Sequence, residues 1–111
     1  MRITTDSKHE ILLPEASKLT SDYRKSAPKD SAGNYLQPIA YAFGRNEMIE
    51  LLNQNNAIGF RIYLGMDAKG QITPVITAID EENNDLYNEM LLDMAKPCPD
   101  ICSNENPLNK D

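Results

Sequence analysis

A regular alternation of apolar with polar or small residues runs through residues 58–65, and it constrains the fold more than any other feature of the chain. A period of two is typical of a β-strand with one buried face. A turn sequence follows at residues 67–70, and residues 72–79 are again rich in Ile, Val and Thr. We therefore predict an antiparallel hairpin between residues 58–64 and 72–79. Pro74 cannot donate a ladder hydrogen bond, so the second strand is expected to present an edge there.

Two segments before the hairpin have helical spacing. In the first, apolar residues recur at steps of four, three and four, and Pro14 and Glu15 suit the first turn of a helix that ends at residues 26–28. The second helix is expected over residues 46–52, with Asn46 as its N-cap. The apolar stripe of the first helix consists of Leu12, Ala16, Leu19 and Tyr23.

The remaining segments carry weaker patterns. Residues 86–94 have helical spacing and predict a short third helix, capped by Asn84 or Asp85. Residues 35–43 fit either an edge strand or an irregular lead-in to the second helix, since a proline restricts where a strand can lie. Residues 1–10 are polar and expected to be loose, and residues 97–111 form an irregular tail with three prolines and two cysteines.

Together these elements predict one α+β domain over residues 1–111. Its centre is an antiparallel β-hairpin, with a third strand left open because two strands alone are marginally stable. Two or three helices are expected to pack on one face of the sheet. The periodicities place five side chains in the core, namely Leu19, Leu52, Phe60, Ile62 and Ile76.

The charge is negative and unevenly distributed. The formal net charge is −6, and residues 80–93 hold six acidic residues and no basic one. Such a surface repels phosphate backbones, so no nucleic-acid partner is expected, whereas a basic protein partner is compatible with it. A solvated acidic surface is the favoured interpretation. The chain shows neither the apolar region of a secretion signal nor a bilayer-length apolar run, so we expect a cytoplasmic protein without a membrane partner.

Cys98 and Cys102 form the most distinctive motif. Their C-x-x-x-C spacing differs from the C-x-x-C of zinc knuckles and thioredoxin-like sites, and the single histidine, His9, is far away in the sequence. We expect two reduced thiols in a tail that docks on the domain and buries Ile101 and at least one cysteine. A disulfide or redox pair is the first alternative, and a metal site with ligands from elsewhere is the second. No metal or cofactor is predicted.

Other catalytic patterns are missing from the sequence. Residues 80–91 fail the EF-hand pattern, because Asp85 and Leu91 stand where that loop needs Gly and Glu. The sequence has neither a Gly-x-Ser-x-Gly motif nor a glycine loop that opens a helix. An enzyme is therefore the minority hypothesis.

Arg61 and Tyr63 are the candidate binding residues. They alternate with Phe60 and Ile62, so they lie on the opposite face of the predicted strand. Tyr and Arg are frequent anchors of protein interfaces. Two arrangements stay open: the pair is exposed and binds a partner, or a helix covers it, with Tyr63 packed and Arg61 paired with the acidic turn.

Four stretches together resemble a family of small uncharacterised bacterial proteins. They are PEASKLTSDYRKSAP, AFGRNEMIELLNQ, IGFRIYLGMDAKG and CPDICSNENPLN, in the same order as in that family, and they cover nearly the whole chain. The family shares a G-x-R-I-Y strand and a C-terminal C-P-x-x-C-S tail. The resemblance implies that Arg61, Tyr63, Cys98 and Cys102 belong to its motifs, and it implies no activity.

The function that these observations favour is a small non-enzymatic protein-interaction module. It would act through the exposed strand face or the cysteine-containing tail, on a protein partner that the sequence does not identify. The alternative is a thiol-dependent redox or metal-responsive protein that uses Cys98 and Cys102.

Overall fold

The computed structural model describes residues 2–111 and confirms the α+β class. The chain divides into two compact units. The first consists of the residues up to Lys8 together with Phe43–Ala95, and the second of His9–Ala42 and Lys96–Asp111. The expectation of a single domain over residues 1–111 stays a prediction. Among residues 2–111, no helix has the length and apolar character needed to span a bilayer.

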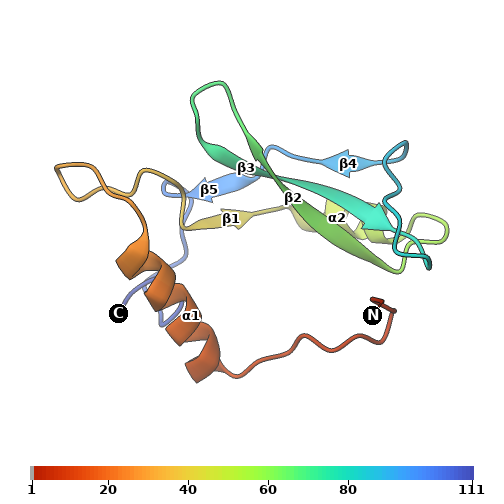
Figure 1. Cartoon of the computed structure of the whole chain (residues 1–111), viewed down its shortest axis with the longest axis horizontal. Helices are drawn as coiled ribbons and strands as arrows, with labels where there is room; N and C mark the ends of the chain where they lie inside the picture. Colours follow the sequence, from red (N-terminus) through yellow and green to blue (C-terminus); the bar gives the residue numbers. More distant parts are fainter. Residues whose placement is uncertain (1) are drawn as a thin grey trace. The chain divides into compact units, whose positions relative to one another are not determined.

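The first unit is built on an antiparallel three-stranded sheet in the order β2-β3-β4 (Figure 1). Strands β2, Gly59–Met66, and β3, Ile72–Ile79, form the predicted hairpin, and β4, Leu91–Leu92, pairs with the other side of β3. The side chain of Asp67 closes the hairpin turn by accepting the N–H groups of Lys69 and Gln71. Gly70 lies in the left-handed region at φ 81°, which a residue with a Cβ rarely adopts.

β3 is the central strand of the sheet, but β4 pairs only with Ile76 and Thr77, so the outer side of β3 is an open edge at Pro74, as expected. Pro74 lies opposite Leu64 of β2 and is buried. Ala78 accepts a hydrogen bond from the Leu86 N–H on the β4 side, and backbone groups alternate in direction along a strand. The backbone nitrogen of Pro74 thus also faces the β4 side, at a level that β4 does not reach. Its missing N–H costs no ladder hydrogen bond.

Helix α2, Arg45–Leu52, packs on β3 and β4. Its one buried residue, Leu51, contributes to a core with Ile76, Ala78 and Leu92. The predicted N-cap, Asn46, is wrong: the capping position is Gly44, and no side chain caps the helix.

The predicted third helix is also wrong. The segment after the acidic turn returns alongside β3, first through a bridge between Ile79 and Asp85 and then as β4. Asp85 accordingly caps no helix. The outer backbone groups of β3 need hydrogen-bond partners once α2 buries this strand, and pairing with the chain at residues 85–92 satisfies them. This long-range requirement overrides the local helical spacing.

Four of the five predicted core residues are exposed. Ile76 is buried as expected, but Phe60, Ile62, Leu52 and Leu19 are not. The alternation along β2 does identify one face, which Phe60 and Ile62 share with Ile76 and Ala78. However, α2 covers this face only over β3 and β4, so the β2 part of it stays open.

The second unit contains α1, Leu13–Ser26, and a two-stranded antiparallel sheet of β1, Ala40–Ala42, and β5, Lys96–Cys98. The strand interpretation of residues 35–43 is thus correct for Ala40–Ala42. The bounds of α1 agree with the prediction, but Leu12, Leu19 and Tyr23 of its apolar stripe are exposed. The buried residue of this helix is Arg24.

Arg24 holds the end of the chain against α1. Its guanidinium donates to the carbonyl oxygen of Leu108 and pairs with the Asp111 carboxylate at 2.6 Å. The tail therefore docks as predicted and buries Cys98, but Ile101 is exposed, contrary to prediction.

The segment of residues 1–10 was expected to be loose. Within it, the Ile3 N–H donates to the side chain of Asn83 at 2.8 Å.

Candidate functional site

The two predicted binding residues meet on Asp85. Arg61 forms an ion pair with the Asp85 carboxylate, and the Tyr63 hydroxyl donates to the same group. Arg61 also donates to the carbonyl oxygen of Asn83 at 3.2 Å. Arg61 is half-buried and Tyr63 is exposed. The structure thus combines the two predicted arrangements, because Arg61 pairs with the acidic turn while Tyr63 faces solvent.

The electrostatics of this cluster follow from its contacts. Hydrogen bonds from Tyr63 and Arg61 and the Arg61 charge hold the pKa of Asp85 below its usual range. The hydrogen bond from Tyr63 to Asp85 raises the pKa of Tyr63, because an ionised Tyr63 could no longer donate this bond and would be repelled by the carboxylate. The pKa of Arg61 is raised by its hydrogen bond to Asp85. Arg61, Asp85 and Tyr63 therefore form a clamp that connects β2 to the acidic turn. Within the clamp, the charged and polar groups are paired with one another.

The open edge of β2 is the second feature of this unit. The Ile58 N–H donates to the Ile79 carbonyl oxygen, so odd-numbered residues of β3 direct their backbone groups toward β2. Their partners in β2 are also odd-numbered, since Arg61 pairs with Thr77 and Tyr63 with Val75. The backbone groups of the even-numbered residues consequently point away from β3. In the sheet formed by residues 2–111, β2 pairs with β3 alone.

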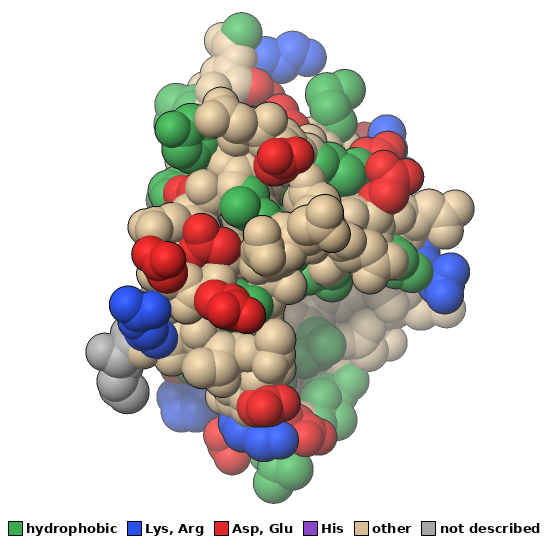
Figure 2. Space-filling view, turned by 90° about the vertical axis from the view of Figure 1, so that its right-hand side faces the viewer, with side chains coloured by type: hydrophobic (Ala, Val, Ile, Leu, Met, Phe, Trp, Pro, Cys, Tyr) green, Lys and Arg blue, Asp and Glu red, His purple; other side chains and the backbone are tan. Residues whose placement is uncertain are grey.

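The even-numbered residues of β2 are also the exposed apolar ones. An exposed edge strand of this length, whose one charged side chain is paired with Asp85, is a template for pairing with another chain. Proteins usually protect such an edge with Lys, Pro or a bulge, and β2 contains neither Lys nor Pro and pairs without interruption from Gly59 to Met66. Apolar and acidic side chains lie interspersed on the face shown in Figure 2. The exposed apolar residues of β2 are Phe60, Ile62, Leu64 and Met66.

The second unit holds the cysteine pair. Cys98 and Cys102 form a disulfide with a Cα–Cα distance of 4.8 Å. The expectation of two reduced thiols is therefore wrong, and the alternative of a disulfide is correct. Cys98 is buried at the end of β5, whereas Cys102 is exposed. The Ile101 N–H donates to the carbonyl oxygen of Pro97 at 2.9 Å and closes the loop between the cysteines.

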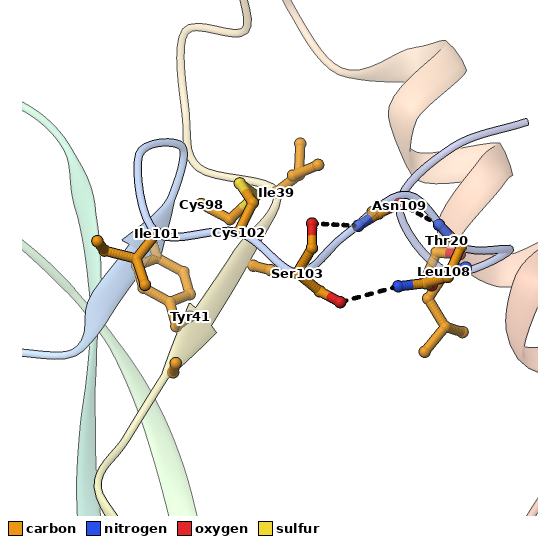
Figure 3. Close-up of a pocket in the computed structure, with 12 residues that line it drawn as sticks. Thr20, Ile39, Tyr41, Cys98, Ile101, Cys102, Ser103, Leu108 and Asn109 are labelled. Carbon is orange, nitrogen blue, oxygen red and sulfur yellow. Dashed lines mark hydrogen bonds between the residues drawn. A yellow bond between two sulfur atoms is a disulfide. The ribbon is translucent and has the colours of Figure 1, made fainter.

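The disulfide borders a cavity of about 440 Å³ within this unit (Figure 3). The side chains of Tyr41 and Ile101 lie at one end of it, and Thr20, Leu108 and Asn109 lie at the other (Figure 3). The Asn109 amide donates to the carbonyl oxygens of Ser103 and Asn104 at 3.3 and 3.1 Å, so its hydrogen-bonding groups serve the fold of the tail. The cavity is mainly apolar, with the disulfide at its margin.

Hydrogen bonds within the acidic turn, residues 80–85, use the Asp80 carboxylate. The Asp80 carboxylate accepts the N–H groups of Glu82 and Asn84, both at 2.9 Å. Within residues 2–111, no group of three or more His, Cys, Asp or Glu side chains is placed to hold a metal ion. The turn shapes the chain so that Asp85 reaches Arg61.

Sequence reasoning anticipated that Arg61 could pair with the acidic turn, but it did not single out Asp85 for this role and missed the open edge of β2. Asp85 was expected at a helix terminus, and its approach to Arg61 depends on the bridge to Ile79. Opposite charges at positions 61 and 85 are the sequence signal for this contact. Comparison of the chain with protein-family models, with curated proteins and with solved structures gives no match. The class that fold and site define is therefore a small α+β protein with an open apolar strand edge.

Proposed function

We propose that this protein is a non-enzymatic interaction module that binds protein by pairing a strand with the edge of β2. The observation that supports this most directly is an edge strand whose outward backbone groups and exposed apolar side chains belong to the same residues. In strand addition, main-chain hydrogen bonds supply affinity, and alternate side chains supply specificity.

The Arg61–Asp85–Tyr63 clamp has a supporting part in this proposal. It fixes the opposite face of β2 to the acidic turn through the ion pair and the Tyr63 hydrogen bond. A strand held in one conformation loses less conformational entropy on binding. Arg61 and Tyr63 thus position the binding strand.

A charge substitution on the edge tests this function. Leu64 is 79% exposed on β2, and Met94 is 83% exposed outside it, so Lys should be tolerated at either position. Proteins cross-linked to the wild type in cell extract should be retained by Met94→Lys and lost by Leu64→Lys, because Lys blocks an edge. An interaction profile unchanged by Leu64→Lys would refute the proposal.

A second candidate function rests on the disulfide. Cys102 is exposed and Cys98 is buried, so an incoming small-molecule thiolate can reach the Cys102 sulfur. Attack there breaks the S–S bond, leaves a mixed disulfide on Cys102 and releases Cys98 as a thiolate, which takes a proton from water. A second thiol then reduces the mixed disulfide, so two thiols yield one external disulfide and two protein thiols.

Thiol labelling tests this second candidate. The untreated protein should resist alkylation, and after reduction Cys102 should react faster than Cys98, as mass spectrometry of the peptides would show. The pair should also equilibrate with glutathione buffers in the range of cytosolic redox potentials. A disulfide that stays oxidised in all such buffers would be structural and would rule out a reversible redox role.

A further inference from the structure

We infer that the partner of the β2 edge is a second copy of this chain, paired antiparallel to it about a two-fold axis through Tyr63. This inference rests on the proposed function and specifies its partner. Two-fold dimers are the commonest protein oligomers, and they require a surface that is complementary to itself. The arrangement of residues on β2 meets that requirement.

The geometry of the strand permits few registers. Even-numbered residues direct their backbone groups toward the open edge, so they must face even-numbered residues of the partner. With the axis at Tyr63, Phe60 would face the partner's Met66, and Ile62 would face the partner's Leu64. All four exposed apolar residues would then be paired across the interface with apolar residues.

The opposite face of the same register also fits. Arg61 would face the small Gly65 of the other copy, and Asp67 would lie diagonally across from the other Arg61, a distance over which opposite charges attract. An axis through Ile62 would instead place the two Arg61 side chains diagonally across from each other. The axis through Tyr63 is therefore favoured because it keeps the two Arg61 side chains apart.

Net charge explains why the copies would meet at this strand. Residues 43–95 contain three Lys or Arg and nine Asp or Glu, so two copies repel over most of this unit. The one charged residue of β2 is Arg61, and its charge is already paired with Asp85. β2 itself carries no acidic residue, and the Asp85 carboxylate that contacts it is paired with Arg61, so repulsion between two acidic copies is weakest along this strand.

A cysteine cross-link tests both the dimer and its register. The native cysteines are joined to each other, so Tyr63→Cys introduces a single free thiol. Residues in a non-hydrogen-bonded antiparallel pair have Cα atoms about 4.5 Å apart, within the range for a disulfide. Mild oxidation should convert most of Tyr63→Cys into a covalent dimer. Phe60→Cys should stay uncross-linked, because the two thiols would lie about 20 Å apart along the strands.

Molar mass in solution completes the test. The purified wild type and Met94→Lys should have about twice the chain mass of 12.5 kDa, and Leu64→Lys should have the mass of one chain. Cross-linking of Phe60→Cys as efficiently as Tyr63→Cys would overturn the register. A wild type that is monomeric at millimolar concentration would overturn the dimer. If Leu64→Lys nevertheless fails to cross-link proteins that the wild type captures from cell extract, the proposed interaction function stands and this inference alone fails.

Discussion

Ile62 and Ile76 lie directly opposite each other in the hairpin, yet Ile76 is 1% exposed and Ile62 is 53% exposed. Both side chains are on the face that α2 covers, but α2 reaches over β3 and not over β2. The two strands of one hairpin therefore have different roles. β3 carries the core, and β2 presents an apolar edge to solvent.

Truncation of these two isoleucines should have unequal effects. Ile76→Ala should lower the free energy of unfolding by about 2–5 kcal/mol, because it leaves a cavity in a packed core. Ile62→Ala should cost less than about 1 kcal/mol in the monomer, since its side chain is already in contact with water. Urea unfolding of the two variants at low protein concentration measures both. Equal losses would mean that β2 is also covered.

Adjacent leucines on α2 offer a second comparison. Leu51 is 0% exposed and Leu52 is 39% exposed. Leu51→Ala should destabilise the protein by about 2–5 kcal/mol, and Leu52→Ala should have a much smaller effect. Thermal melts followed by circular dichroism would distinguish them. A larger shift for Leu52→Ala would show that α2 is rotated about its axis relative to the present structure.

The Arg61–Asp85–Tyr63 clamp should make the stability of the fold depend on pH. Its pKa is lowered in the folded protein, so the carboxylate stabilises the fold at pH values above the ordinary carboxyl range and loses this effect as the pH falls. The free energy of unfolding of the wild type should exceed that of Asp85→Asn by about 1 kcal/mol or less near neutral pH, a typical value for a solvent-accessible ion pair. This difference should shrink as the pH falls below about 4.

Urea midpoints of both proteins between pH 7 and pH 2 measure this difference. Asp100→Asn, in the exposed loop between the cysteines, serves as the control and should follow the wild type at every pH. A gap between the wild type and Asp85→Asn that stays constant down to pH 2 would contradict the lowered pKa.

Arg24 should anchor the C-terminal tail to α1. Arg24→Met keeps the apolar length of the side chain but removes its contacts to Leu108 and Asp111. Charged hydrogen bonds contribute about 1.5–3 kcal/mol each, so amide exchange at residues 106 and 108–110 should accelerate about tenfold to hundredfold. Lys25→Met is the matched control, because Lys25 is the exposed neighbour in the same helical turn. Unchanged exchange in Arg24→Met would mean that other contacts hold the tail.

Local features of the sequence determined the hairpin, its turn and the bounds of α1. Alternation over residues 58–65 reports strand geometry directly, and Asp67 and Gly70 serve the turn through contacts within a few residues. Pro14 and Glu15 likewise act inside one helical turn. These elements were predictable because their causes lie within short stretches of chain.

Tertiary structure decided which residues are buried and which groups form the candidate site. Periodicity identified the face that Phe60 and Ile62 share with Ile76, but coverage depends on where α2 packs, and α2 is distant in sequence from β4. Residues 86–94 have helical spacing, but part of this segment forms β4 instead, because the outer backbone groups of β3 require hydrogen-bond partners. That same pairing carries Asp85 to Arg61 and leaves β2 as the edge. Backbone hydrogen bonding between distant segments, which no local pattern encodes, therefore determined the surface that we propose to bind.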